Sequence, residues 1–249
     1  MKRMLVTHAT SGLVLSLNAQ VATDRIVAEI RAGRYEAREL ETASRLVEPG
    51  DRVLELGAGI GFVSAGVMRN VAPAFYAAVE ADARLIPHIH ETHARNAVTG
   101  VEVIHAAFAT DPAVLAAGSV AFRRHREFWR SGIGQDQPGS LDSVAVPVRD
   151  ASAFIAEHDI SVLIADIEGA ELELFRHMAF GTLARIIVEL HPQRFGRAGV
   201  REIFARLGAA GFVYNEALSA GAVACFESPR AISTTRNAGL RLADQDALP

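Results

Sequence analysis

A glycine-rich turn at residues 57–61, Gly-Ala-Gly-Ile-Gly, directly follows a short apolar run. Glycines at such a turn let a ligand approach the backbone, where the free N–H groups of the next helix begin. Glu55 precedes the turn, and Glu80 ends the next apolar run. A carboxylate at the end of the neighbouring strand can accept hydrogen bonds from both hydroxyls of a ribose. The pattern predicts a nucleotide-like ligand; the simpler alternative is a tight turn without a ligand.

The spacing of the glycines separates two classes of ligand. Dinucleotide-binding turns have the pattern G-x-G-x-x-G, which places a pyrophosphate. Here the glycines stand at 57, 59 and 61, and Phe62 follows them. This G-x-G-x-G pattern resembles motif I of the class I methyltransferases, which implies S-adenosylmethionine as the cofactor. We expect cofactor contacts from Glu55, Gly57, Ala58, Gly59, Gly61, Phe62, Glu80, Ala81, Ala107, Phe108 and Asp166.

A second acidic motif, Asp-Ile-Glu-Gly-Ala-Glu, occupies residues 166–171 after a buried apolar run. Carboxylates at the end of a buried strand are costly unless they are used or solvated. The carboxyl ends of parallel strands line the ligand crevice, so we expect Asp166 and Glu168 to face the site. Glu171 falls in the first turn of a helix, where the helix dipole favours a negative charge. We therefore interpret Glu171 as structural.

Three segments together resemble the FkbM-type methyltransferases: residues 53–61, residues 166–171, and Ile-Val-Glu-Leu-His at 187–191. Their order and spacing match over about residues 35–192, including Tyr35-Glu36 and the turn at 49–51. Glu55 departs from the family, which commonly has Asp there. The resemblance implies methyl transfer from S-adenosylmethionine, usually to an oxygen of a sugar, polyketide or other secondary metabolite.

A hydroxyl acceptor benefits from a general base or from a metal that lowers its pKa. The candidate catalytic residues are His191, Asp166, Glu168 and Glu189. In one interpretation His191 is the base, held by a nearby carboxylate. In a second, all four residues form an oxygen-rich site suited to Mg²⁺ or Mn²⁺. In a third, Glu189 and His191 merely end a strand in solvent. The sequence by itself assigns no metal ligand.

Apolar runs alternate with helical patterns along the chain, as in parallel βαβ units. With the resemblance, they predict an α/β, Rossmann-like, doubly wound sheet of seven mostly parallel strands with an antiparallel C-terminal strand. Residues 1–50 are expected to form a cap and lead-in helices, and 51–227 the methyltransferase domain. An insertion is expected at about 109–143, and a flexible tail at 228–249. The third strand is expected to run from 101 to 108.

The insertion carries Arg123, Arg124, Arg126, Phe128, Trp129 and Arg130. These residues form either a lid that recognises an acidic substrate or a solvated basic surface with aromatic residues packed on the core. His88, His90 and His93 share one predicted helix and are interpreted as surface residues.

Composition limits the classes of protein that fit. The chain has 249 residues, 50% hydrophobic and 22% charged, with a formal net charge of −4 and one cysteine, Cys225. We therefore expect no nucleic-acid or membrane partner and a cytoplasmic location. The resemblance to the FkbM-type enzymes implies a small-molecule acceptor. Two rival functions stay open: an NAD-dependent oxidoreductase on a related sheet, and a non-catalytic S-adenosylmethionine-binding module. The oligomeric state is not predicted.

Overall fold

The computed structural model describes residues 3–133, 138–229 and 231. Its large sheet has seven strands in the order β12-β13-β11-β10-β3-β4-β5. The strands are β3 (Arg52–Leu56), β4 (Phe75–Glu80), β5 (Val101–His105), β10 (Val162–Ala165), β11 (Arg185–Glu189), β12 (Val213–Tyr214) and β13 (Val223–Glu227). Strands β11, β10, β3, β4 and β5 pair in parallel, and β13 pairs antiparallel to both of its neighbours. The predicted fold class is confirmed.

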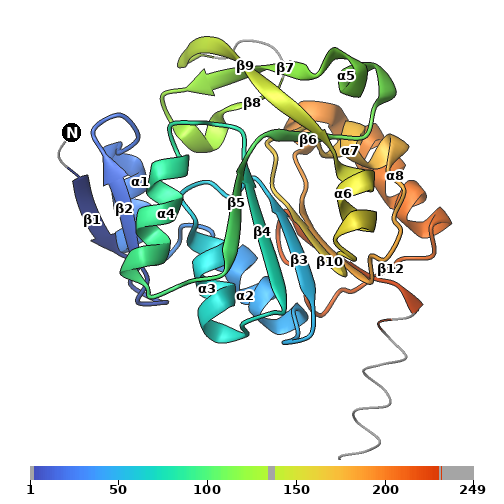
Figure 1. The fold of residues 1–249 in the computed structure, drawn as a ribbon, viewed down its shortest axis with the longest axis horizontal. Helices are drawn as coiled ribbons and strands as arrows, with labels where there is room; N and C mark the ends of the chain where they lie inside the picture. The colour runs from blue at the N-terminus through green and yellow to red at the C-terminus, as the bar shows by residue number, and fades with distance from the viewer. Residues whose placement is uncertain (1–2, 134–137, 230, 232–249) are drawn as a thin grey trace, which may run out of the picture.

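Helices cover both faces of this sheet (Figure 1). One face packs against α2 (Ala37–Leu46), α3 (Phe62–Asn70) and α4 (Ile86–Arg95), and the other against α6 (Ala151–Glu157), α7 (Glu171–His177) and α8 (Pro192–Ala209). Side chains alternate between the two cores along each strand. In β3, for example, Val53 belongs to the first core, and Leu54 and Leu56 belong to the second.

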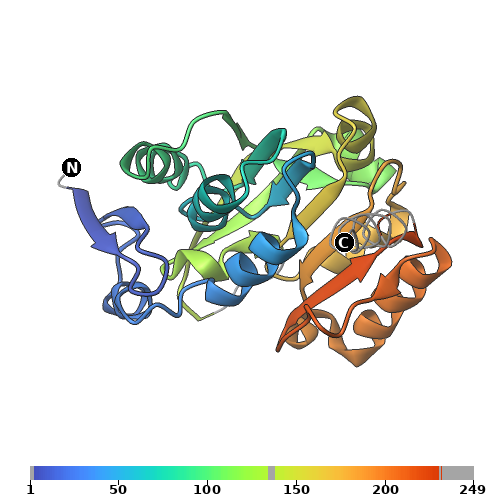
Figure 2. The same ribbon diagram turned by 90° about the horizontal axis from the view of Figure 1, so that it is seen from below.

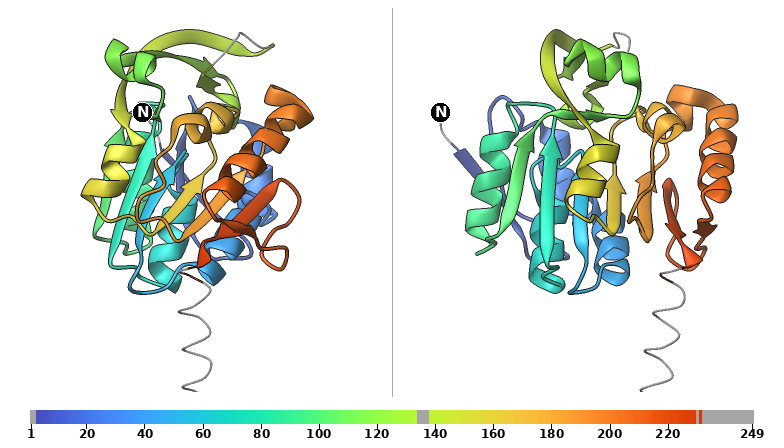
Figure 3. Two further views of the ribbon diagram at one scale, coloured as in Figure 1. Left: turned by 90° about the vertical axis from the view of Figure 1, so that its right-hand side faces the viewer. Right: turned by 45° about the vertical axis from the view of Figure 1, so that its right-hand side comes forward.

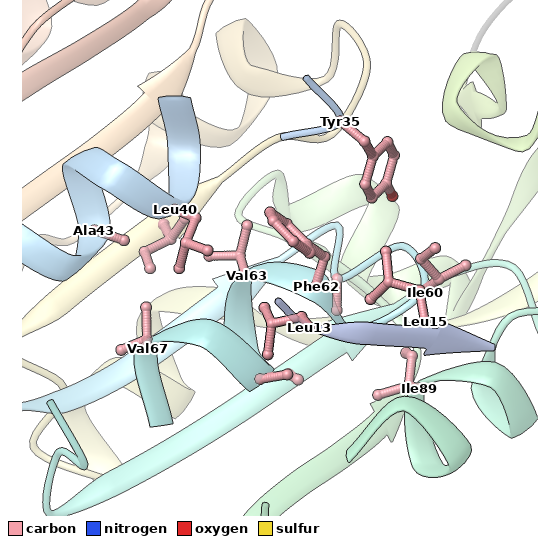
Figure 4. Close-up of a cluster of buried hydrophobic side chains, with 14 of the residues drawn as sticks. Leu13, Leu15, Tyr35, Leu40, Ala43, Ile60, Phe62, Val63, Val67 and Ile89 are labelled. Atoms are coloured by element: carbon pink, nitrogen blue, oxygen red, sulfur yellow. The ribbon is translucent and has the colours of Figure 1, made fainter. Parts of the chain in front are cut away.

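The N-terminal segment forms a hairpin of β1 (Arg3–Thr7) and β2 (Val14–Asn18), followed by α1 (Asp24–Arg31). The hairpin and the C-terminal strand β13 lie at opposite ends of the molecule (Figure 2). Strand β2 packs on α4, and Leu13 and Leu15 join the core formed by α2, α3 and α4 (Figure 4).

A second, four-stranded sheet with the order β6-β9-β7-β8 lies across one end of the large sheet (Figure 3). Its segments are β6 (Ala107–Ala109), α5 (Pro112–Ala117), β7 (Ser119–His125), the 3₁₀-helix η1 (Phe128–Arg130), β8 (Gly132–Ile133) and β9 (Ser140–Asp150). The third strand is thus shorter than expected, because the chain changes sheets after His105. The Ala106 N–H donates to the Glu80 carbonyl, at 3.2 Å, and Ala107 then pairs with Val148 of β9.

Two of the three histidines interpreted as surface residues are buried: His88 is 2% exposed and His93 is 6% exposed. His88 Nδ1 lies 3.4 Å from Ser16 Oγ of the hairpin, and His93 Nε2 lies 2.9 Å from Ser64 Oγ of α3. The surface interpretation was wrong for these two residues, because the hairpin packs over His88 and helix α3 packs against His93.

The predicted tail lies outside the described residues, except for 228, 229 and 231. Within the described part, no helix is both long and apolar enough to cross a membrane.

Candidate active site

The glycine turn joins β3 to α3 and contacts the second acidic motif directly. Gly57 has a left-handed backbone, with φ of 89°, and a Cβ atom there would lie 1.7 Å from the Asp166 carbonyl oxygen. The N–H groups of Gly57 and Ala58 both donate to the Val79 carbonyl, at 3.0 and 2.9 Å. Only glycine fits at position 57, because both its backbone conformation and its contact exclude a side chain. The turn is thus fixed to both neighbouring strands.

Glu80, at the end of β4, faces this turn. Its Oε2 accepts from the Gly59 N–H at 2.8 Å, and its Oε1 accepts from the Asp82 N–H at 2.7 Å. Burial raises the pKa of Glu80 to about 7. Each carboxylate oxygen keeps a lone pair that a ligand hydroxyl can use.

A cavity with about 760 Å³ of empty space, open solvent included, lies at the carboxyl ends of β3, β4 and β10. The predicted cofactor and catalytic residues that line the cavity are Gly57, Gly59, Glu80, Ala81, Ala107, Phe108, Asp166 and Glu168. Two motifs far apart in the sequence therefore meet in one cavity.

Four predicted cofactor residues, Glu55, Ala58, Gly61 and Phe62, are not among the residues that line this cavity. Glu55 is 3% exposed and shares a face of β3 with Val53, so it points into the core rather than into the cavity. Phe62 is fully buried, with its ring 5.7 Å from the Tyr35 ring (Figure 4). These four residues therefore face the core beside the turn and not the cavity.

The cavity also includes residues that sequence reasoning did not assign to the site. Glu36 precedes α2 with a left-handed backbone, φ 45° and ψ 26°, and lines the cavity. Burial raises the pKa of its carboxyl well above the usual range. A non-glycine residue in this conformation is strained, and such strain is concentrated at functional sites. The only sequence signal was the Tyr35-Glu36 pair noted in the family resemblance.

The second sheet forms one wall of the cavity. Phe122, Phe128, Trp129 and Ile133 of this sheet line the cavity, and the rings of Phe128 and Trp129 meet edge to face with centroids 5.3 Å apart. None of the insertion's arginines is among the lining residues. Arg124, for example, pairs with Asp142 within the second sheet. The aromatic residues thus line the cavity, as the lid interpretation expects, whereas the arginines lie outside it, as the basic-surface interpretation expects.

His191 follows β11 and is held by a buried carboxylate. Its Nδ1 lies 2.9 Å from Glu171 Oε1, with the His191 side chain 6% exposed and the Glu171 side chain fully buried. The same Glu171 oxygen accepts from the N–H groups of Ile167 at 3.1 Å and Gly169 at 3.2 Å. Glu171 lies in the first turn of α7, as expected, but it also orients His191. This second contact was missed because it spans twenty residues of sequence.

The predicted catalytic residues come together at the edge of the cavity. His191 Nε2 lies 3.7 Å from Asp166 Oδ1 and 3.6 Å from Glu168 Oε2. Glu189 offers an oxygen atom to the same cluster as Asp166 and His191. Burial, followed by repulsion from neighbouring carboxylates, raises the pKa of Asp166 well above its usual range, and burial raises that of Glu168 to about 7.

Part of the chain that contains the acidic motif matches a known protein family. Residues 120–214 match the Methyltransferase FkbM domain. The match confirms the FkbM resemblance seen in the motifs. The matched FkbM segment contains the acidic motif and the end of β11, whereas the glycine turn lies before it. No curated protein matches the chain.

Solved structures with a similar fold include an FkbM methyltransferase from Methylobacillus flagellatus KT. It has 13% sequence identity and a TM-score of 0.48, and the alignment covers 84% of this chain and 56% of that one. M. jannaschii TYW2 in complex with AdoMet has 12% identity and a TM-score of 0.46, with 92% and 88% covered. Precorrin-6y C5,15-methyltransferase from Geobacter metallireducens GS-15 has 14% identity and a TM-score of 0.41, with 72% of each chain covered.

Proposed function

We propose that the protein transfers a methyl group from S-adenosylmethionine to a hydroxyl of a small molecule, sugar or secondary metabolite. The observation that carries the proposal is the position of the glycine turn between two carboxylates. Glu80 on one side and Asp166 on the other line the same cavity as Gly57 and Gly59. Exposed glycine backbone suits the amino-acid part of the cofactor, and an acid beside it suits a ribose.

The cofactor would extend along the carboxyl ends of the strands. Its ribose hydroxyls would donate to Glu80, and its adenine would pack against Ala107 and Phe108. Glu36 lies across the cavity close to Gly59, with its Oε1 only 3.4 Å from where a Cβ of residue 59 would stand. We assign Glu36 to the cofactor's ammonium group, because a buried carboxylate is stabilised by a cationic partner.

The methyl transfer is an in-line displacement. The acceptor oxygen forms a bond to the methyl carbon, the carbon–sulfur bond breaks, and its electron pair returns to sulfur, which leaves as a neutral thioether. The acceptor proton passes to the cluster of Asp166, Glu168, Glu189 and His191 or to water beside it. The leaving group is already activated, so the protein mainly supplies proximity and alignment.

Calorimetric titration tests the cofactor assignment. We expect S-adenosylmethionine to bind one site per chain and NAD to bind at least about tenfold more weakly, since the G-x-G-x-G turn lacks the G-x-G-x-x-G spacing that places a pyrophosphate. Preference for NAD would overturn the proposal in favour of an oxidoreductase. The control variant Glu102→Gln removes an exposed carboxylate of β5 outside the cavity and should bind S-adenosylmethionine like the wild type.

Incubation with methyl-labelled S-adenosylmethionine and a metabolite extract tests turnover and identifies the acceptor. We expect label in a small molecule with a new methyl ether. Cofactor binding without transfer to any component, under conditions where a known methyltransferase labels its acceptor in the same extract, would favour the non-catalytic binding module.

A further inference from the structure

The cluster at the ends of β10 and β11 has the composition of a metal site. Asp166, Glu189 and His191 each offer one ligand atom, and these atoms all lie within 4.8 Å of one another. Asp166 directly follows β10 and Glu189 ends β11, and these strands pair in parallel with Ala165 opposite Val188. The sheet register therefore places the side chains on a rigid support, as a binding site requires.

The orientation of His191 is the second observation. Glu171 Oε1 also accepts two backbone N–H groups, so it is an acceptor toward Nδ1. The proton then lies on Nδ1, and Nε2 presents a lone pair to the carboxylates. Histidines that bind metals commonly donate their other N–H group to a carboxylate in this way. The side chain is 6% exposed, so its Nε2 atom is directed into the cluster and away from bulk water.

The spacing leaves room for an ion between the ligand atoms. Nε2 lies 3.7 Å from Asp166 Oδ1, beyond hydrogen-bond distance. Two ligands bound at about 2.1 Å to one cation lie about 3 to 4.2 Å apart. Asp166 Oδ1 is also a buried oxygen without a hydrogen-bond partner among the described residues. Such an atom needs a partner, and a cation would provide one.

We propose that Asp166, Glu189 and His191 bind one divalent cation of the Mn²⁺ or Mg²⁺ class, with Glu171 as the residue that orients His191. Carboxylate oxygens suit both ions. Of the two, Mg²⁺ keeps more strictly to oxygen ligands, so the imidazole nitrogen favours Mn²⁺. Resting on the function proposed above, this inference gives the cation a role: it would bind the acceptor oxygen and lower the pKa of the hydroxyl. Glu168, at 3.6 Å from Nε2, borders the site.

Electron paramagnetic resonance with Mn²⁺ tests the site on the full chain after treatment with a chelator. We expect one bound Mn²⁺ per chain. Asp166→Asn and Glu189→Gln should each weaken binding at least about tenfold, since each removes an anionic ligand. Glu102→Gln, an exposed carboxylate on β5, is the matched control and should bind like the wild type. Circular dichroism verifies that each variant is folded.

A second measurement needs no variant. Electron spin echo spectra of Mn²⁺ bound to the wild type should contain modulation from a directly coordinated imidazole nitrogen. Absence of this modulation, or binding that the two substitutions leave unchanged, would overturn the proposed ligand set. The absence of any binding at about 1 mM Mn²⁺ would overturn the metal site itself.

The same preparations separate this proposal from the proposed function. Mn²⁺ binding with the expected ligands but without S-adenosylmethionine binding would support the metal site and overturn the methyltransferase assignment. S-adenosylmethionine binding and methyl transfer that persist in a chelator, without Mn²⁺ binding, would overturn the metal site alone.

Discussion

The imidazole of His191 lies with its Nδ1 atom 2.9 Å from the Oε1 atom of Glu171, a fully buried carboxylate twenty residues earlier in the chain. The histidine follows the end of strand β11, and the glutamate lies in the first turn of α7. Because Nδ1 contacts Glu171, the Nε2 atom of His191 faces Asp166 and Glu168, so Glu171 acts as a positioning residue.

Glu171→Gln tests this positioning role. The amide cannot act as a charged acceptor toward Nδ1, so we expect methyl transfer and Mn²⁺ affinity to fall about 10- to 100-fold. S-adenosylmethionine affinity should stay within about twofold, because Glu171 does not line the cavity. Glu173→Gln, an exposed position on the same helix, is the control. Equal losses in cofactor binding and metal binding would indicate a general structural role instead.

Gly57→Ala should destabilise the protein severely. The added Cβ atom would overlap the Asp166 carbonyl, at 1.7 Å, and the backbone φ is 89°. We expect a loss of at least about 3 kcal/mol in unfolding free energy, or failure to fold. Gly100→Ala is a matched control, with φ of 79° and no atom within 4 Å of its Cβ position. Its cost should be about 1–2 kcal/mol, the strain of the left-handed backbone alone. Urea unfolding measures both, and similar losses in both variants would contradict the contact.

Cofactor affinity should depend on the ionisation of Glu80. Its pKa is raised to about 7 by burial, and the ionised carboxylate is the better acceptor for ribose hydroxyls. S-adenosylmethionine should therefore bind about tenfold more tightly at pH 8 than at pH 6, since the ionised fraction changes by that factor around the pKa. Calorimetry at both pH values measures the ratio. Glu80→Gln should bind weakly at both pH values with a smaller ratio, and an unchanged ratio would exclude Glu80 as its source.

Stability should fall as pH rises between 6.5 and 8 because of Glu55. Burial raises its pKa from 4.5 to about 8, so the folded state binds a proton that the unfolded state has already released. The loss over this interval is about 1.5 kcal/mol. His93 does not interfere, because burial lowers its pKa to about 4, so its contribution is lost only below pH 6.5.

Urea unfolding of the wild type and Glu55→Gln at pH 6.5 and 8.0 tests this dependence. The difference between the two proteins isolates Glu55, since the other groups titrate in both. Parallel pH dependences in the wild type and the variant would contradict the assignment.

Trp129 is the single tryptophan of the chain and lines the cavity, so it can report on ligand binding. We expect a saturable change in its fluorescence when S-adenosylmethionine is added. Trp129→Phe should keep cofactor affinity within about threefold, because a ring of similar character remains, but it should lose the fluorescence signal. Emission that stays constant while calorimetry detects binding would place the cofactor away from Trp129.

Much of the sheet could be predicted because local patterns specify it. The apolar runs of β3, β4, β10 and β11 are buried on both faces, and the glycines at 57–61 need a left-handed or closely packed backbone. These are properties of single residues and their immediate neighbours. The point where β5 ends could not be predicted, because residues 101–108 form one continuous pattern and only pairing with β9 separates Ala107 from β5.

Some features of the candidate site could likewise be predicted from the sequence, and others could not. The types and spacing of Glu80, Asp166 and His191 made them candidates from the sequence alone, since carboxylates and histidine after buried strands are costly without a use. Tertiary structure decided which of these groups meet. It turned Glu55 into the core, placed Glu36 in the cavity, and paired Glu171 with His191. Such contacts depend on strand register and on helix packing between residues distant in sequence. No short segment of the chain determines the register or the packing.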